Sequence, residues 1–204
     1  MPRFDKTYWE DHWGPAATGR GHRLAAHPAL GTETSSLPIE TALDAGCGSG
    51  AEATWLAGRG WRVTGADISR NALDTAATRA NAAGLSDRIE WVETDLSRWQ
   101  PGRAWDLVTT SYAHPDSGQL AFYERIASWV APDGTLLIIA HAAGHRHHDG
   151  DHPADAVATL SDITRLLPAP EWRIESRYEN TRTLRPGHRV VSLRDVIVRA
   201  RRRA

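Results

Sequence analysis

The chain has 204 residues, with 24 Lys and Arg against 25 Asp and Glu, and this length predicts one domain. The balanced charge argues against nucleic acid or an anionic membrane as a partner, and the single cysteine, Cys47, excludes an intrachain disulfide and a cysteine-based zinc site. We find no apolar run near the ~18 residues of a membrane helix and no signal-peptide core at the start, so we expect a soluble cytoplasmic protein.

The first 37 residues are polar and irregular in pattern, and we expect residues 1–37 to form a cap on a domain of residues 38–204. Within the cap, the stretch from Tyr8 to Trp13 is unusually aromatic. These rings have two candidate roles: to pack the segment against the core and to cover a bound ligand. The two roles are compatible. Aromatic faces attract onium cations by about 0.5–2 kcal/mol, which favours Trp9 or Trp13 as the cover of a cationic ligand.

From Ile39 onward, short apolar strands alternate with helices. We predict strands at Thr41–Ala45, Trp61–Ala66, Arg88–Val92, Trp105–Thr110 and Thr135–Ala140. We predict helices at Ala51–Ala57, from a Ser69 cap to about Ala83, and at Gln119–Val130, with a turn at Pro132–Gly134. Strands that alternate with helices predict an α/β fold with a parallel, doubly wound sheet.

The last third of the chain has a different pattern. A loop rich in His, Gly and Asp spans Ala143–Pro153, and a helix is predicted at Ser161–Leu167. Two strands, Glu171–Tyr178 and Arg189–Arg199, follow without a helix between them and are joined around Gly187. Consecutive strands of this kind predict an antiparallel hairpin that closes the sheet.

A glycine-rich segment, from Asp44 to Gly50, lies where the first strand turns into the first helix. Glycines at such a turn let the backbone approach a ligand closely and adopt positive φ. The third glycine comes one residue too early for a dinucleotide fingerprint, and no lysine follows as a phosphate-binding P-loop requires. The pattern D-x-G-x-G-x-G resembles motif I of the class I S-adenosylmethionine (SAM)-dependent methyltransferases.

The resemblance is strong over residues 39–141 and rests on topology elsewhere. It implies a Rossmann-like seven-stranded sheet in the order 3-2-1-4-5-7-6 with the last strand antiparallel, and SAM as the cofactor, released as S-adenosylhomocysteine (SAH). It implies that Asp67 accepts hydrogen bonds from the ribose hydroxyls, and that Asp95 accepts one from the adenine amine. The full set of cofactor-binding residues implied in this way is Trp13, Asp44, Gly46, Gly48, Gly50, Asp67, Ile68, Asp95, Leu96 and Ser111.

The acceptor side carries fewer signals. The stretch Ser111–Asp116 lacks the Asn/Asp-Pro-Pro-aromatic pattern of DNA and many protein N-methyltransferases, and Cys47 inside the glycine loop disfavours a catalytic cysteine. We therefore expect a small-molecule acceptor with an O, N or soft S, Se or Te nucleophile. The short chain and aromatic N-terminus are loosely similar to the tellurite-resistance and thiopurine-type methyltransferases.

Three side chains near the strand ends are candidates for catalysis: Tyr112, His114 and His141. Histidine suits base work because its pKa lies near neutrality. The loop with His145, His147, His148 and His152 lacks a helix-face ligand pair, so we expect no metal.

Two alternatives to a small-molecule methyltransferase stay open. One is an RNA or protein methyltransferase that uses the arginines of residues 199–203, although no aromatic RNA-stacking module accompanies them, and nucleic acid is not the expected partner. The other is a SAM-binding protein without catalysis. The sequence is compatible with a monomer or a homodimer.

Overall fold

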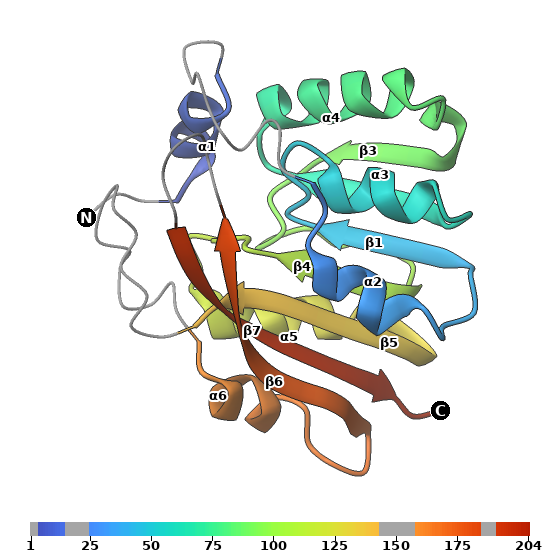
Figure 1. Ribbon diagram of the computed structural model, residues 1–204, viewed down its shortest axis with the longest axis vertical. Coiled ribbons are helices and arrows are strands. Elements are labelled where there is room, and N and C mark those ends of the chain that lie inside the picture. The colour runs from blue at the N-terminus through green and yellow to red at the C-terminus, as the bar shows by residue number, and fades with distance from the viewer. Residues whose placement is uncertain (1–3, 15–24, 143–157, 185–190) are drawn as a thin grey trace.

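The computed structural model describes residues 4–14, 25–142, 158–184 and 191–204. Its centre is a seven-stranded sheet in the order β3-β2-β1-β4-β5-β7-β6, in which only β7 runs antiparallel to its neighbours (Figure 1). The strands are β1 (Thr41–Ala45), β2 (Arg62–Asp67), β3 (Ile89–Glu93), β4 (Trp105–Ser111), β5 (Val130–His141), β6 (Trp172–Leu184) and β7 (Val191–Arg202). The predicted fold class and strand order are confirmed.

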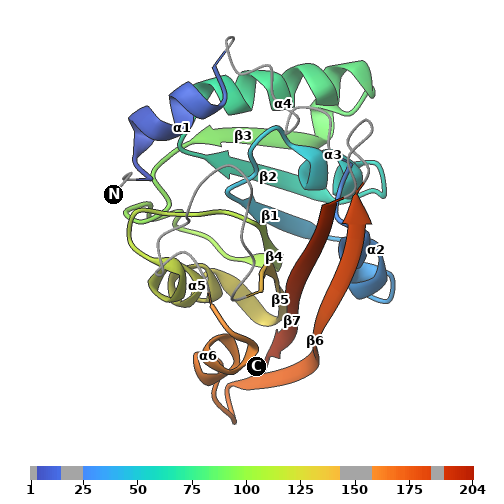
Figure 2. The same cartoon turned by 60° about the vertical axis from the view of Figure 1, so that its left-hand side comes forward.

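Helices cover both faces of this sheet (Figures 1 and 2). The helices α2, α3 and α4 pack on one face, α5 and α6 on the other, and α1 lies beside the start of α4. Their bounds are α1 (Lys6–His12), α2 (Pro28–Thr34), α3 (Ala51–Ala57), α4 (Arg70–Ala82), α5 (Gln119–Ala127) and α6 (Leu160–Arg165), with a 3-10 turn at Ser86–Arg88.

Strand β5 shows why the sheet needs both helical layers. Leu136 and Ile138 belong to the apolar core under α5 and α6, whereas Leu137 and Ile139 belong to the core under α2 and α3. All four side chains are almost wholly buried, and each contributes about 1.5–3 kcal/mol by leaving water. The continuous apolar run is therefore the sequence signature of a central strand covered on both faces.

Helix α4 begins and ends with the predicted residues. The Ser69 side chain accepts a hydrogen bond from Ala72 N at its start, and Gly84 follows its end with a φ of 69°. Positive φ costs glycine little, so Gly84 lets the chain leave the helix sharply.

Several predicted boundaries are wrong. Helix α5 ends at Ala127, and the turn predicted at Pro132–Gly134 is a bulge inside β5, because Trp105 pairs with Val130 whereas Leu107 pairs with Thr135. The hairpin strands extend to Leu184 and Arg202, beyond their predicted ends. The loop around Gly187 and the His-rich loop from Ala143 lie outside the described residues.

The N-terminal segment holds two helices where no regular structure was predicted. Helix α2 belongs to the core, since Leu30 is fully buried between α3 and β5, whereas α1 lies over the carboxyl edge of the sheet.

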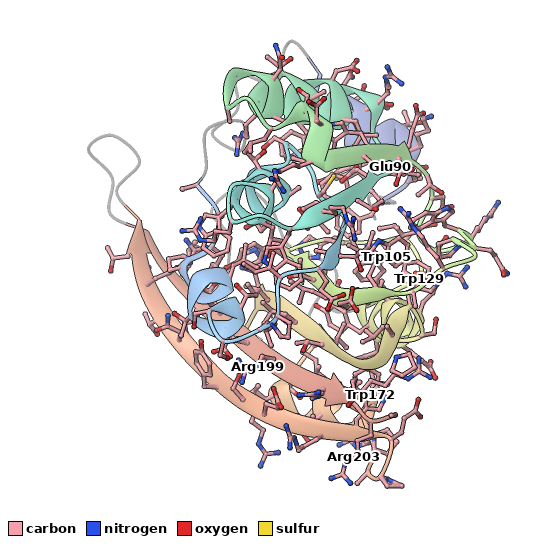
Figure 3. The ribbon with its side chains drawn as sticks, turned by 90° about the vertical axis from the view of Figure 1, so that its right-hand side faces the viewer. Glu90, Trp105, Trp129, Trp172, Arg199 and Arg203 are labelled. Atoms are coloured by element: carbon pink, nitrogen blue, oxygen red, sulfur yellow. The ribbon has the colours of Figure 1, made fainter. Side chains whose placement is uncertain are left out.

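Arg199, Arg201 and Arg202, near the C-terminus, lie in strand β7 and form ion pairs with acidic side chains. Arg199, labelled in Figure 3, keeps only 18% of its side chain exposed. It forms ion pairs with Glu33 and Glu175. Arg201 and Arg202 pair with Asp133 and Glu171. These residues form part of β7 and are balanced by acidic neighbours.

Most tryptophans pack in or against the core. Trp105 and Trp129 lie together where β4 and β5 begin, and Trp172 is buried at the start of β6 (Figure 3). In the described part of the chain, none of the helices has the length and apolar character needed to cross a membrane.

Candidate active site

A cleft of about 1000 Å³ opens at the carboxyl ends of the parallel strands, with α1 along its rim. Ligands of open α/β sheets bind in this position. Of the thirteen residues proposed from sequence, all but Gly50 line the cleft. Gly50 instead caps α3 with a φ of 71°, and a Cβ there would come within 2.7 Å of both Ala76 and Trp91.

The glycine loop after β1 forms the floor of the cleft. Gly46 and Gly48 have φ values of 76° and 48°, a region that side chains disfavour. A Cβ on Gly46 would lie 2.4 Å from that of Ala113, and one on Gly48 would lie 2.9 Å from the ring of Trp13. The loop is thus packed between the segment after β4 and Trp13.

Asp67, at the end of β2, holds this loop from beneath. One carboxylate oxygen accepts a hydrogen bond from Gly48 N at 2.8 Å, and the other accepts one from Ser69 N at 2.9 Å. Burial raises the pKa of Asp67, although these backbone donors oppose the shift. A carboxylate oxygen can accept more than one hydrogen bond, so Asp67 keeps acceptor capacity toward the cleft for ribose hydroxyls. That geometry fits the ribose role expected from the sequence.

Asp44 lines the floor of the cleft, is buried, and also supports the loop. Its side chain accepts a hydrogen bond from Ala53 N at 3.0 Å and so ties β1 to the first turn of α3. Burial, followed by the nearby Glu52 carboxylate, raises the pKa of Asp44 well above its ordinary value. The contact it makes is with the protein backbone that shapes the loop.

Asp95 and Leu96 lie farther along the cleft, beyond the end of β3. One oxygen of Asp95 accepts hydrogen bonds from the backbone and hydroxyl of Ser97, at 2.9 Å and 2.6 Å. Leu96 is buried, and both Leu96 and Ile68 line the cleft. A carboxylate and two apolar side chains that line the same cleft fit an adenine ring with its exocyclic amine.

The segment after β4 carries two unusual features. Ser111 Oγ is buried, lines the cleft and has no hydrogen-bond partner among the described residues. Such a group normally has a partner, so its environment suits a polar ligand group. The next residue, Tyr112, has a φ of 57°, which is rare for an aromatic residue.

The three proposed catalytic side chains form one aromatic wall. The ring centroids of Tyr112 and His141 are 4.2 Å apart, and those of His114 and His141 are 6.0 Å apart. Phe4 continues the wall, with its centroid 5.8 Å from that of His114. The structure therefore brings together residues that lie in two separate segments of the sequence.

Sequence reasoning missed three residues around this wall. Asp195, from β7, is wholly buried and accepts hydrogen bonds from Tyr112 Oη at 2.7 Å and Arg182 Nε at 2.7 Å. His27 Nε2 lies 3.0 Å from the same carboxylate, and its Nδ1 accepts a hydrogen bond from Ala29 N. Because Nδ1 is an acceptor, His27 is neutral and donates from Nε2.

The charges of this cluster follow from its hydrogen bonds. Burial raises the pKa of Asp195, but the hydrogen bonds from His27, Tyr112 and Arg182 outweigh it and bring the pKa down to about 2. Burial and the bond to Asp195 raise the pKa of the Tyr112 hydroxyl far above its ordinary range. Tyr112 therefore keeps its proton. A metal-binding group of three or more His, Cys, Asp or Glu residues is absent from the described ranges of the chain.

Helix α1 carries an aromatic surface that faces the cleft. Tyr8, Trp9, His12 and Trp13 line it together with Phe4. Some of the rings meet edge to face, as Tyr8 and Trp9 do with centroids 5.1 Å apart, and others stack, as Phe4 and Trp9 do at 5.9 Å. The aromatic cluster predicted from the sequence is thus a wall of the cleft.

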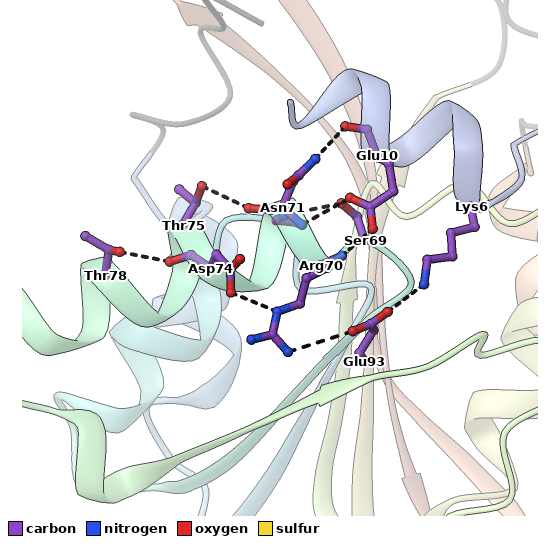
Figure 4. Close-up of polar contacts among 10 residues, drawn as sticks. Lys6, Glu10, Ser69, Arg70, Asn71, Asp74, Thr75, Thr78 and Glu93 are labelled. Carbon is purple, nitrogen blue, oxygen red and sulfur yellow. Dashed lines mark hydrogen bonds and ion pairs between the residues drawn. The ribbon is translucent and has the colours of Figure 1, made fainter. Parts of the chain in front are cut away.

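The opposite side of α1 is fastened to the start of α4 by Glu10 (Figure 4). Its carboxylate accepts hydrogen bonds from Ser69 Oγ at 3.0 Å, Arg70 N at 2.8 Å and Asn71 N at 3.1 Å. A carboxylate is favoured there because helix N-termini carry unpaired N–H groups and partial positive charge. Lys6 adds an ion pair with Glu93 at 2.6 Å (Figure 4).

We expect Glu10→Ala to weaken SAH binding by about five- to tenfold, because it removes about 1 kcal/mol of helix-end contacts that hold α1 over the cleft. Titration calorimetry measures this change. Asp11→Ala is the matched control, because Asp11 has the same charge and is exposed on the same helix. Equal affinities of the two variants would show that the Glu10 contacts do not support ligand binding.

Comparison with known proteins gives a consistent result. Residues 42–134 match the family described as methyltransferase domain. Thiocyanate methyltransferase 1 of Arabidopsis thaliana is 33% identical over 164 residues, 78% of this chain and 69% of that protein. The protein of the same name from Brassica oleracea is 30% identical over 164 residues, covering 78% and 70%. The structure of magnesium protoporphyrin IX methyltransferase from Synechocystis PCC 6803 with bound SAH has a TM-score of 0.68 and 18% identity, and covers 97% of this chain and 99% of that one. At that identity the likeness concerns the fold.

Proposed function

Because this chain belongs to the class I SAM-dependent methyltransferases, we propose that it transfers a methyl group to a small, soft sulfur nucleophile, either thiocyanate or a thiol. The methyl group moves from the SAM sulfonium to the acceptor sulfur in one in-line displacement, which releases SAH. Catalysis then consists mainly of alignment and exclusion of water.

The arrangement of the cleft along the sheet edge carries this proposal. In the order of the strands, Asp95 follows β3, Asp67 ends β2 and the glycine loop follows β1. These three sites suit adenine, ribose and methionine in turn. Ser111 then meets the methionine end, and the part of the cleft beyond β4 remains for the acceptor.

The charged side chains of the cofactor half also support SAM as the ligand. Asp67, Glu93 and Asp95 line this half beside two cations, of which Lys6 pairs with Glu93 and Arg98 lies 3.7 Å from Asp95. Among the described residues no such cation pairs with Asp67, and SAM carries positive charge on its sulfonium and amino groups. The rings of Trp9 and Trp13 on α1 suit a sulfonium cation. We infer that α1 acts as the lid over this half, whereas α2 belongs to the core.

The acceptor half suits a small sulfur compound. Its walls are the aromatic rings of Phe4, Tyr112, His114 and His141, and aromatic rings attract polarisable sulfur. Two of the relatives reported above are thiocyanate methyltransferases. Thiocyanate has no proton to lose, whereas a thiol needs a base. Since Tyr112 keeps its proton, we assign that role to His114 or His141.

Incubation of the purified protein with labelled SAM and either thiocyanate or 2-mercaptoethanol tests the function. We expect methyl thiocyanate and the methyl thioether, detected by gas chromatography, together with SAH, detected by liquid chromatography. His114→Asn and His141→Asn are compared with the parent chain, and one of them is expected to lower the thiol rate at least tenfold while the thiocyanate rate changes less than threefold. SAH binding without methyl transfer to either acceptor would reject the proposal and favour a SAM-binding role without catalysis.

A further inference from the structure

We propose that Arg182 determines acceptor specificity by donating hydrogen bonds to an anionic acceptor. This inference rests on the proposed function and names the group that selects the acceptor within the same cleft. No motif in the sequence marks Arg182, which lies inside a strand.

The topology of the hairpin brings Arg182 to the cleft. Strand β6 is antiparallel to β7, and β7 is antiparallel to β5, so β6 ends at the same edge of the sheet as the parallel strands. Arg182 lies near that end of β6, and Asp195 lies near the start of β7. His141, at the end of β5, is the register partner of Asp195. Arg182 therefore meets the acceptor half of the cleft, on the side away from Asp67.

Two neighbours fix the guanidinium group of Arg182. Its Nε donates to Asp195 at 2.7 Å, and one Nη donates to the Tyr112 hydroxyl at 2.9 Å. The other Nη has no hydrogen-bond partner among the described residues, while Arg182 lines the cleft and keeps 20% of its side chain exposed. A guanidinium held at two corners presents its remaining donors with little loss of side-chain freedom.

The surrounding charges favour an anion over a cation here. Among the described residues of the acceptor half, Arg182 is the permanent cation, His27 is neutral, and Asp116 is the acidic residue that also lines the cleft. Asp195 offsets the charge of Arg182 but is wholly buried behind it. Arg182 therefore recognises an anion through the N–H groups of its guanidinium. Such charge-assisted hydrogen bonds are stronger than neutral ones.

The backbone of Tyr112 supports the same assignment. Its φ of 57° is strained for an aromatic residue, and three contacts hold it: its hydroxyl with Asp195 and Arg182, its ring on His141, and its N–H to Ile139 O at 3.0 Å. Strain of this kind persists where the surroundings over-determine a position, and it concentrates at functional sites. Tyr112 and Asp195 are therefore positioning residues for Arg182.

Titration of thiocyanate into the SAH complex, followed by calorimetry, tests the proposal without any turnover. We expect Arg182→Gln to weaken thiocyanate binding at least tenfold and Arg182→Lys to weaken it by a smaller factor, because lysine keeps the charge but not the fork of donors. Arg177→Gln is the matched control: Arg177 is exposed on the same strand and does not line the cleft, and its loss should change binding less than twofold. SAH affinity should stay within twofold of the parent value in all three variants.

Steady-state kinetics then separate this inference from the proposed function. We expect Arg182→Gln to raise KM for thiocyanate at least tenfold with a smaller effect on kcat, and to lower the preference for thiocyanate over the neutral 2-mercaptoethanol. Tyr112→Phe, which keeps the ring, should raise KM by a smaller factor. Parent-like thiocyanate affinity in folded Arg182→Gln, or an SAH complex of the parent chain that does not bind thiocyanate, would overturn the inference. Arg182-dependent binding without methyl transfer would instead reject the proposed function alone.

Discussion

Asp67→Ala is expected to weaken SAH binding at least a hundredfold and to abolish measurable methyl transfer at micromolar SAM. The carboxylate is placed to accept two ribose hydroxyls, and a hydrogen bond to a charged group contributes about 1.5–3 kcal/mol. The same side chain accepts the N–H groups of Gly48 and Ser69, so its loss also loosens the floor of the cleft. Titration calorimetry with SAH measures the combined effect.

An SAH analogue that lacks one ribose hydroxyl separates the loss of the ribose contacts from the loosening of the cleft floor. The parent chain should bind SAH about tenfold more tightly than its 2′-deoxy analogue, and Asp67→Ala should bind both ligands equally. If the variant keeps the tenfold preference, Asp67 shapes the loop but does not contact the ribose. Asp44→Asn serves as a second comparison: Asp44 is also buried and supports the loop, but its contact is with Ala53 N, so the preference for the hydroxyl should remain.

The cofactor half of the site could be predicted because its signals are local in the sequence. A strand end, a glycine loop and an acid about 20 residues later lie within one strand-helix-strand unit, and the parallel sheet places all three at one edge. Each of these features depends on backbone geometry that only a few residue types allow, as Gly46 and Gly48 illustrate with their positive φ values.

The cluster around Asp195 could not be predicted in the same way. His27 and Asp195 are 168 positions apart, and no local pattern links them. A bulge between Ile174 and Ser176 shifts the register of the hairpin, so counting alternate residues along β6 does not show which face Arg182 occupies. One feature of the sequence does point to this cluster. Asp195 directly precedes the apolar run of β7, and a charged side chain buried in a strand needs hydrogen-bonding partners.

The short helices of the N-terminal segment illustrate a second limit. Isolated helices as short as α1 and α2 are unstable, and tertiary contacts decide whether they form. Glu10 binds α1 to α4, and the His27 side chain caps α2 while it binds Asp195. Those partners lie at least 59 residues later in the chain, beyond any sequence window.

Asp195→Ala is expected to have the largest effect on stability. It leaves the Arg182 guanidinium, the Tyr112 hydroxyl and His27 Nε2 without their shared acceptor. Removal of one partner from a buried ion pair costs about 3–5 kcal/mol, so Tm should fall by about 8–15 °C in a chain of this size. Glu179→Ala is the matched control, because Glu179 pairs with Arg194 on the exposed face of the same hairpin and should cost less than about 1 kcal/mol.

The pH dependence of this effect has a definite sign. The folded-state pKa of Asp195 is about 2, below the ordinary value of 3.8, so the unfolded chain takes up the proton first as the pH falls. The carboxylate therefore contributes about 2–3 kcal/mol that is fully present above pH ~4 and is lost as the pH falls toward 2. Urea unfolding of the parent chain and of Asp195→Asn should show a constant difference in unfolding free energy from pH 7 to about 4.5 and a smaller difference at pH 3. A difference that stays unchanged down to pH 3 would mean that Asp195 acts by packing and hydrogen-bond geometry alone, and that its charge does not hold Arg182 in the cleft.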